Sequence, residues 1–230
     1  MRSILAALLC VGQAVAGEPL PGLPESPRIL FQGDSITDGN RGRGADLNHV
    51  HGHGFVYLLA ARIGAGAPGQ NATFLNRGVS GHTVLDLAKR WPKDTLELKP
   101  DVLSVLIGVN DSSKDVAPEV FERTYDELLT TARAANPKLR LVLCEPFLGV
   151  TGAAIDKSPG RRERLALLVP VVRRLAAKHG ATLVDFQKVF DEAQSRAPSS
   201  YWIWDGVHPT TAGHQLMADE WERVVRASWR

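Results

Sequence analysis

Short apolar runs alternate with amphipathic segments along most of the chain. Five runs have the length and character of buried strands, and they cover residues 28–31, 73–76, 102–107, 139–144 and 182–185. The segments between and after them carry helical spacing and helix-end signals, over about 55–63, 83–88, 118–135, 161–179 and 211–225. This alternation predicts an α/β fold in which a doubly wound parallel sheet carries helices on both faces.

The first residues have the pattern of a secretory signal peptide. Arg2 precedes an apolar run over residues 4–11, and Ala14-Val15-Ala16 forms an Ala-x-Ala cleavage site before Gly17. The run is much shorter than the roughly 20 residues that cross a bilayer. We therefore expect residues 1–16 to be removed and the protein to be secreted or periplasmic, with no membrane anchor. Residues 17–27 then form an extended lead-in, and residues 28–230 form one domain.

Composition narrows the classes of partner. Of the two cysteines, Cys10 lies in the predicted signal peptide and Cys144 remains alone, so no intramolecular disulfide is expected. Without Arg2, 26 basic residues face 25 acidic ones in an interspersed pattern. A net charge this close to zero gives no indication of a nucleic-acid partner.

Polar motifs follow three of the predicted strands. Ser35 comes after the first strand, Gly78 after the second and Asn110 after the third. The carboxyl ends of parallel strands share one edge of the sheet, where ligands bind in open α/β folds. Each residue also has an ordinary structural interpretation, as a turn residue or a helix cap.

A later turn completes a possible catalytic set. A nucleophilic serine needs a base, an orienting acid and donors for the oxyanion. Asp205 and His208, at i and i+3, allow one turn to bring the acid to one ring nitrogen of the base. The backbone N–H groups of Ser35 and Gly78 and the amide of Asn110 are the predicted oxyanion donors. Asp205 and His208 could alternatively be a simple turn pair, but the set as a whole predicts acyl transfer at Ser35.

These motifs resemble the SGNH, or GDSL, hydrolase family. Its four blocks are matched in family order by Gly33-Asp34-Ser35-Ile36-Thr37, residues 76–81, Gly108-Val109-Asn110-Asp111 and Asp205-Gly206-Val207-His208. The resemblance implies a three-layer α/β/α sandwich of flavodoxin type, with five parallel strands in the order 2-1-3-4-5. It also implies serine esterase chemistry with the triad Ser35, His208 and Asp205, and with no metal or other cofactor. Ile36 stands where the family name has leucine.

A closer resemblance, over residues 76–111, is to acetylxylan esterases and other carbohydrate O-acetylesterases. It implies an acetyl ester on a small or polymeric carbohydrate as substrate. Two alternatives remain open, namely a lysophospholipase or thioesterase that acts on longer acyl esters, and a secreted carbohydrate-binding module without activity.

Several residues beside the predicted triad are candidates for binding the substrate. Trp202 and Trp204 precede the catalytic turn and could stack on sugar rings, although packing in the core is the alternative. Asp34 is included because it orders the turn around Ser35. His53 could hydrogen-bond to a substrate hydroxyl. Its alternation with His49 and His51 also suggests a metal site, but no second cluster of ligands at suitable spacing accompanies them.

Overall fold

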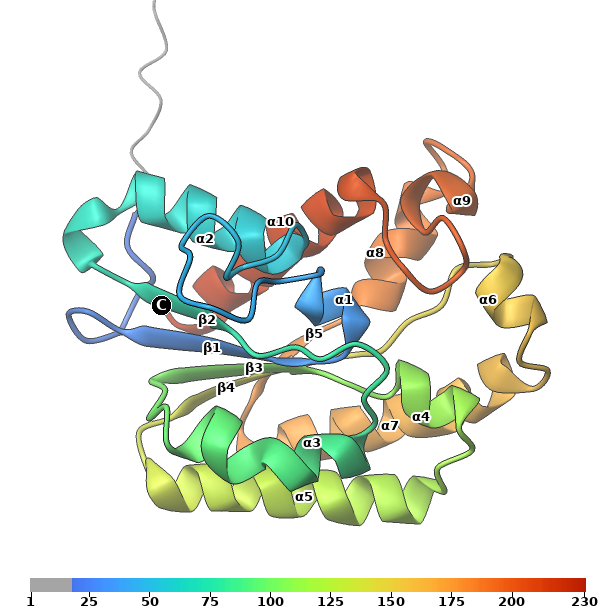
Figure 1. Cartoon of the computed structure of the whole chain (residues 1–230), viewed down its shortest axis with the longest axis horizontal. Coiled ribbons are helices and arrows are strands. Elements are labelled where there is room, and N and C mark those ends of the chain that lie inside the picture. The colour runs from blue at the N-terminus through green and yellow to red at the C-terminus, as the bar shows by residue number, and fades with distance from the viewer. Residues whose placement is uncertain (1–17) are drawn as a thin grey trace, which may run out of the picture.

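Five parallel strands form one sheet in the order β2-β1-β3-β4-β5 (Figure 1). Their bounds are β1 Arg28–Gly33, β2 Thr73–Asn76, β3 Val102–Leu106, β4 Arg140–Cys144 and β5 Thr182–Val184. Each predicted run therefore forms one strand, with ends that differ by no more than two residues. Both the doubly wound architecture and the implied strand order are confirmed. The order reverses between β1 and β3, which places the ligand-binding crevice beyond the carboxyl end of β1.

This computed structural model describes residues 18–230. The predicted signal peptide, residues 1–16, lies outside the described residues. No helix among residues 18–230 has the length and apolar character needed to cross a membrane.

Helices cover both faces of the sheet. The α-helices are α1 Ser35–Asp38, α2 Phe55–Gly66, α3 Val84–Trp91, α4 Val109–Ser113, α5 Pro118–Ala135, α6 Ala153–Asp156, α7 Arg161–His179, α8 Phe186–Ala193, α9 Ser199–Trp202 and α10 Thr211–Ser228. Figure 1 shows α2, α8 and α10 over one face and α3, α5 and α7 over the other. The residues after α3, Pro92–Leu96, continue as a π-helical turn, and Pro68–Gln70 forms a 3₁₀ turn.

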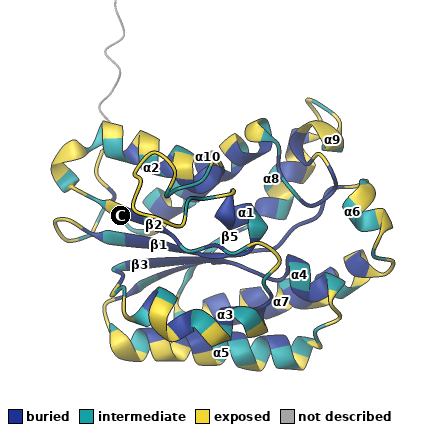
Figure 2. Ribbon diagram, viewed as in Figure 1, coloured by how far each residue is buried: buried dark blue, intermediate teal, exposed yellow. Residues whose placement is uncertain are grey.

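Each face of the sheet packs its own apolar core, as the dark interior of Figure 2 shows. Strand side chains alternate between the two cores, so that Ile29 and Phe31 enter one and Leu30 enters the other. Two buried polar groups in this interior are paired with each other, because Trp221 Nε1 of α10 donates to Ser104 Oγ of β3 at 3.0 Å. The cores hold the strand ends, and hence the site, in fixed positions.

The lead-in is attached to the domain. Leu20 is 1% exposed, and its N–H and C=O both bond to the side chain of Gln70, at 2.9 Å each. Arg226 of α10 donates to the carbonyl groups of Glu18 and Pro19. Residues 18–27 are therefore attached to the domain. The sequence predicted an extended segment here but not these contacts.

Candidate active site

Ser35 lies at the first position of α1, immediately beyond β1. Asp34 caps this short helix, since its Oδ1 accepts from the N–H of Ile36 at 3.0 Å. Gly33 has no room for a side chain, because a Cβ there would lie 2.4 Å from both Leu106 O and Thr37 Oγ1. The close turn from strand to helix leaves the Ser35 side chain at the sheet edge. The N–H of Ser35 belongs to the first turn, where helical N–H groups have no intrahelical acceptor.

Three side chains form a hydrogen-bonded chain at this edge. Ser35 Oγ lies 2.9 Å from His208 Nε2, and His208 Nδ1 lies 2.7 Å from Asp205 Oδ2. The other carboxylate oxygen of Asp205 accepts the N–H groups of Val207 and His208 at 2.9 and 2.8 Å. Burial alone would raise the pKa of Asp205, but the hydrogen bonds from the His208 N–H, its ring and Val207 outweigh burial and lower it. An ionised Asp205 can therefore orient His208 as a base toward Ser35.

Asn110 reaches this edge from α4. Its Nδ2 donates to the carbonyl of His82 at 3.1 Å, which fixes the amide plane. An amide nitrogen carries two hydrogens, so one N–H is left for a ligand. This geometry is compatible with the predicted role of Asn110 as an oxyanion donor.

Gly78 does not have the geometry that the sequence predicts. Its N–H donates to Asn76 Oδ1 at 2.9 Å, and its backbone packs so tightly that a Cβ would lie 2.3 Å from Asp38 N. That hydrogen bond contradicts the prediction that Gly78 supplies a free oxyanion N–H. Gly78 is required because of close packing of two backbones behind the site.

Gly81, in the same sequence block, has a free backbone N–H instead. It is exposed with φ +79°, a Cβ on it would meet nothing within 4 Å, and its N–H donates to no acceptor among residues 18–230. The neighbouring Ser80 donates through N–H and Oγ to Asp38 of α1, at 3.0 and 2.9 Å. On its other side, the His82 carbonyl accepts from Asn110. The residues on either side of Gly81 are thus bonded to α1, the helix that begins with Ser35, and to Asn110. The feature of the sequence that could have identified Gly81 is that it is the second glycine of this block, three residues after Gly78.

Comparisons with known proteins identify the family. The model of the GDSL-like lipase/acylhydrolase family matches residues 31–216. The chain belongs to this family. It is 31% identical over 215 residues to an acetylxylan esterase of Geobacillus stearothermophilus, a match that covers 88% of the chain and 95% of the relative. This GDSL hydrolase is accordingly a carboxylic ester hydrolase.

Solved structures show the same fold. A putative GDSL-like lipase from Parabacteroides merdae has a TM-score of 0.83 and 37% identity, covering 90% of this chain and 99% of that one. A catalytic serine-to-alanine mutant of the Geobacillus stearothermophilus acetylxylan esterase has a TM-score of 0.77 and 29% identity, covering 88% of this chain and 95% of that one.

The residues predicted to bind substrate divide into two groups. Trp204 is 64% exposed directly before Asp205, and His53 is also exposed, so both remain predictions. Trp202 is buried, and its Nε1 donates to the carbonyl groups of Ala193 and Ala197, at 3.1 and 3.2 Å. Asp34 is only 1% exposed. The structure therefore argues against direct substrate contacts by Trp202 and Asp34, since more than nine-tenths of each residue is buried.

The other two histidines of the segment have local partners. His51 Nε2 lies 3.0 Å from the carbonyl of Phe74, and His49 Nδ1 lies 2.7 Å from Asp46 Oδ2. Within residues 18–230, no group of three or more His, Cys, Asp or Glu side chains is arranged to hold a metal ion.

A group of buried charged residues lies behind the GDSL site. Its cation, Arg161, was not predicted from the sequence. Arg161 of α7 donates to Val109 O at 2.7 Å and to Ala154 O at 3.2 Å. Val109 precedes Asn110, while the N–H of Ala154 donates to the carbonyl of Asp205. Arg161 thus joins the segment that carries the oxyanion amide to the segment that carries the triad acid.

Two buried carboxyl groups lie in this region, and the charge of Arg161 acts on one of them, Asp34. Burial raises the pKa of Asp34 to about 7; the negative charge of Asp111 adds to the rise, and the positive charge of Arg161 opposes it. Burial likewise raises the pKa of Asp111 to about 6. One oxygen of each carboxyl, and Nε of Arg161, are buried without a hydrogen-bond partner among residues 18–230. Protons on these carboxyl groups relieve the cost of burying their charge.

Proposed function

We propose that this hydrolase removes acetyl groups from carbohydrates through an acyl-serine intermediate. The observation that carries the proposal is the hydrogen-bonded chain from Ser35 through His208 to Asp205, with heavy-atom distances of 2.9 and 2.7 Å. The acetylxylan esterase relative, which matches 88% of the chain, supports acetyl carbohydrate as the substrate class.

In the acylation half, Ser35 Oγ attacks the ester carbonyl carbon while His208 Nε2 takes the hydroxyl proton. Asp205 stabilises the resulting imidazolium through Nδ1. The carbonyl oxygen gains the negative charge, and the Ser35 N–H, the Gly81 N–H and the Asn110 amide donate to it. The C–O bond to the sugar then breaks, and His208 gives its proton to the departing alkoxide, which leaves as the sugar alcohol.

The deacylation half repeats these steps with water. His208 takes a proton from water, whose oxygen attacks the acetyl carbon on Ser35. Collapse of the tetrahedral intermediate breaks the bond to Ser35 Oγ, which recovers the proton from His208 and releases acetate.

The first experiment compares wild type with Ser35→Ala on p-nitrophenyl acetate and p-nitrophenyl octanoate, and measures acetate release from acetylated xylan. We expect hydrolysis of the acetate and of xylan in wild type only. Turnover by Ser35→Ala at the wild-type rate would refute the mechanism. Faster hydrolysis of octanoate than of acetate would favour the longer-chain acyl hydrolase instead.

We also propose that residues 1–16 direct export and are then cleaved. Expression of the full chain in a bacterial host, followed by N-terminal sequencing of the periplasmic protein, tests this. A first residue at Gly17 is expected, and an intact N-terminus in the cytoplasm would contradict it.

A further inference from the structure

A group of charged side chains gathers beside the loop that joins β2 to α3. Its members are Arg41, Arg43, Arg77, Arg90, Asp38 and Asp94. Two of these arginines are neutralised. Arg43 forms a two-pronged ion pair with Asp38, at 3.0 and 2.8 Å, and Arg90 lies 3.4 Å from Asp94.

The other two, Arg41 and Arg77, have no carboxylate within ion-pair distance among residues 18–230. Arg41 uses Nε to donate to the carbonyl of Gly78 at 3.0 Å, and Arg77 donates only to the carbonyl of Asn76, at 3.4 Å. The terminal nitrogens of Arg41 and one terminal nitrogen of Arg77 donate to no described residue. The group therefore holds two uncompensated positive charges, one from the loop after α1 and one from the residue before Gly78.

This arrangement is unfavourable for the protein alone. Arg41 is half-buried, and burial, followed by the charges of Arg43 and Arg77, lowers its pKa to about 10. Desolvated like charges repel each other more strongly than exposed ones do. A bound anion would relieve both the repulsion and the desolvation, and guanidinium groups match carboxylates well.

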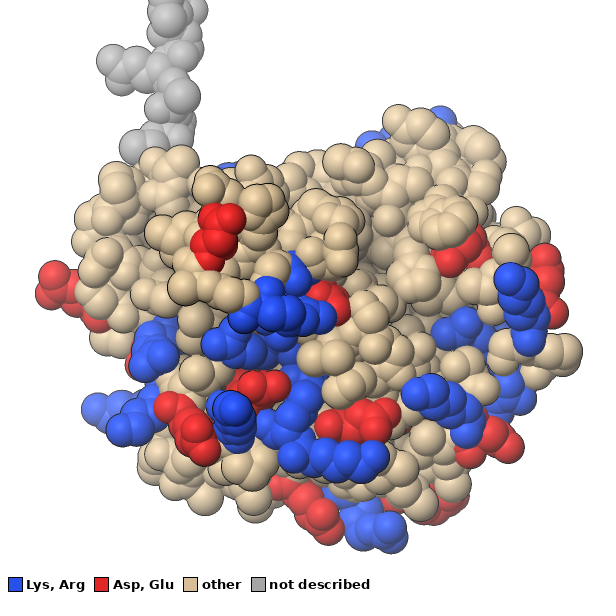
Figure 3. Space-filling view, viewed as in Figure 1, with Lys and Arg blue, Asp and Glu red and all other residues tan. Residues whose placement is uncertain are grey.

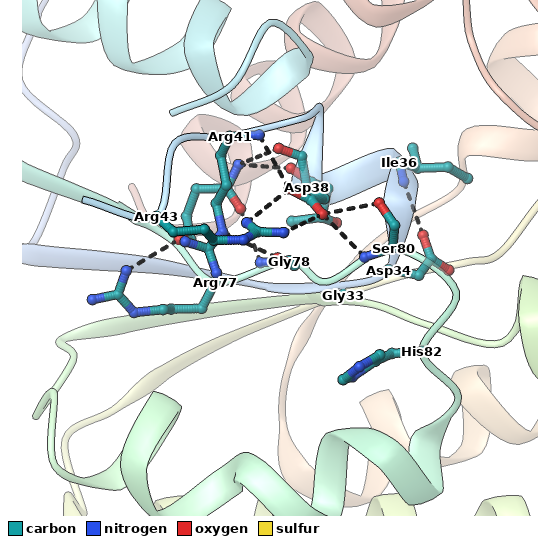
Figure 4. Close-up of polar contacts among 12 residues, drawn as sticks. Gly33, Asp34, Ile36, Asp38, Arg41, Arg43, Arg77, Gly78, Ser80 and His82 are labelled. Carbon is teal, nitrogen blue, oxygen red and sulfur yellow. Dashed lines mark hydrogen bonds and ion pairs between the residues drawn. The ribbon is translucent and has the colours of Figure 1, made fainter. Parts of the chain in front are cut away.

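The two free guanidinium groups lie near the C-terminal end of α1, the helix that begins with Ser35, because Arg41 donates to the carbonyl of Gly78 and a Cβ on Gly78 would lie 2.3 Å from Asp38 N. Asp38, which binds Arg43, is three residues after Ser35 on α1, or about 5 Å along the helix axis. Figure 4 shows Arg41, Arg43 and Arg77 on one side of Asp38, and Ser80 and Asp34 on the other. In Figure 3, Lys and Arg side chains gather near the middle of the face shown, with Asp and Glu side chains among them.

A groove extends from Arg77 along the free edge of β2. Its volume is about 670 Å³, and its lining includes Arg77, Phe74, His51, Leu47 and Tyr57. Leu47 and Tyr57 are exposed although they are large and apolar. An aromatic ring beside polar groups is a surface on which sugar rings can stack. The groove has room for parts of a substrate that extend beyond the reacting ester.

We propose that Arg41 and Arg77 bind a carboxylate of the substrate, so that the enzyme acts on acetyl groups of uronate-bearing oligosaccharides. This inference rests on the proposed function and specifies its substrate class. The ester lies at Ser35, the uronate carboxylate lies between the two guanidinium groups, and further sugar units extend along the groove.

The experiment measures kcat/KM for an acetylated, glucuronate-bearing xylo-oligosaccharide and for the same oligosaccharide with its carboxyl groups reduced to alcohols. Wild type is expected to prefer the charged substrate by about 10-fold or more, which corresponds to one or two charge-assisted hydrogen bonds. Arg77→Gln and Arg41→Gln should each reduce this preference, mainly through KM, and the double variant should abolish it. Added salt should weaken the preference in wild type.

Arg123→Gln is the matched control, because Arg123 is an exposed arginine on α5 with no ion pair among residues 18–230. It should keep the full preference. Equal kcat/KM for both substrates in wild type, or a preference that survives in the Arg41→Gln/Arg77→Gln protein, would overturn the proposal.

A binding experiment separates this inference from the proposed chemistry. Calorimetric titration of Ser35→Ala with the charged oligosaccharide requires no turnover, and the affinity should fall about 10-fold when Arg77→Gln is added. If p-nitrophenyl acetate is not hydrolysed by wild type but this difference in affinity is observed, the esterase mechanism fails and the carboxylate site stands. Competition by inorganic phosphate as strong as that by the oligosaccharide would show a general anion site and would contradict a saccharide carboxylate.

Discussion

At the scale of single residues, Gly78 and Gly81, two glycines of one sequence block, have different roles. The N–H of Gly78 donates to Asn76, whereas the N–H of Gly81 donates to no acceptor among residues 18–230. Both residues are glycines, and they lie three positions apart in the same sequence block. Only the contacts of each backbone separate a packing glycine from a candidate oxyanion donor.

Substitutions at Gly78 and Asn110 should therefore have different effects. Gly78→Ala inserts a Cβ 2.3 Å from Asp38 N, and overpacking of this kind costs about 1–3 kcal/mol of unfolding free energy or more. Asn110→Ala should lower kcat about 10²–10³-fold, because one oxyanion donor is lost. Urea denaturation and steady-state kinetics on p-nitrophenyl acetate measure both effects. Asn48→Ala, on the exposed loop, is the control for a lost amide. Unchanged kcat in Asn110→Ala would exclude its amide from the oxyanion site.

The protonation of Asp34 gives a second prediction at this scale. Its pKa is raised to about 7 in the folded protein from 3.8, so its contribution to stability is complete below about pH 4 and is lost as pH rises through 7. Asp34→Asn does not titrate, but its Oδ1 can still cap α1. The unfolding free energy of wild type relative to this variant should thus fall by about 4 kcal/mol between pH 4 and 7.5.

Urea denaturation at several pH values measures this difference. Asp115→Asn is the control, because the Asp115 side chain is 85% exposed, and its difference from wild type should change little with pH. A pH-independent difference for Asp34→Asn would mean that Asp34 is ionised throughout.

At the scale of elements, α7 does more than cover the sheet. Through Arg161, which is 6% exposed, it holds the carbonyl groups of Val109 and Ala154. These two residues belong to the segments that present Asn110 and Asp205. The relative position of the oxyanion amide and the triad acid thus depends on one buried side chain of a helix that carries none of the predicted catalytic residues.

Arg161→Met should consequently affect both stability and turnover. The substitution removes the two hydrogen bonds from the guanidinium to the carbonyl groups of Val109 and Ala154, and a hydrogen bond from a charged donor typically contributes about 1.5–3 kcal/mol. We expect kcat to fall more than KM changes, because Asn110 and Asp205 lose their common support. Arg161→Lys should recover part of both losses. Arg174→Met, on the same helix, breaks an exposed pair with Glu122 and should cost no more than about 1 kcal/mol. Wild-type kcat in a folded Arg161→Met protein would contradict the positioning role.

At the scale of the whole molecule, the lead-in before β1 belongs to the folded domain. Leu20 joins the core cluster on the α2 and α10 side, and Gln70 and Arg226 bind the backbone around it. The segment is only a few residues long and rich in Pro and Gly. Its order comes from burial of one side chain and from hydrogen bonds to residues that are distant in the sequence.

Leu20→Ala should therefore destabilise the whole domain. A buried Leu→Ala change typically costs about 2–5 kcal/mol. Leu47→Ala is the control, because Leu47 is 81% exposed and its loss should change stability by less than about 0.5 kcal/mol. Thermal unfolding followed by circular dichroism compares the two. Equal melting temperatures for both variants would show that the lead-in contributes nothing to stability.

The sequence by itself determined the sheet, its layers and the edge where the polar motifs meet. It could do so because apolar runs and helical periodicity are local properties, and because parallel strands place their carboxyl ends together. Ser35 and Asn110 were found in this way, whereas Asp205 and His208 were found from their i, i+3 spacing, and the structure joins Ser35, His208 and Asp205 by hydrogen bonds.

The tertiary structure alone decided which neighbouring groups are free and which are occupied. Trp202 and Trp204 are two residues apart, yet one is a core residue and the other is exposed. Arg161 gave no sequence signal, because its partners are carbonyl groups of segments before it in the chain. Whether an N–H, a ring or a guanidinium is available to a ligand depends on contacts between distant segments, and these contacts exist only after the chain has folded.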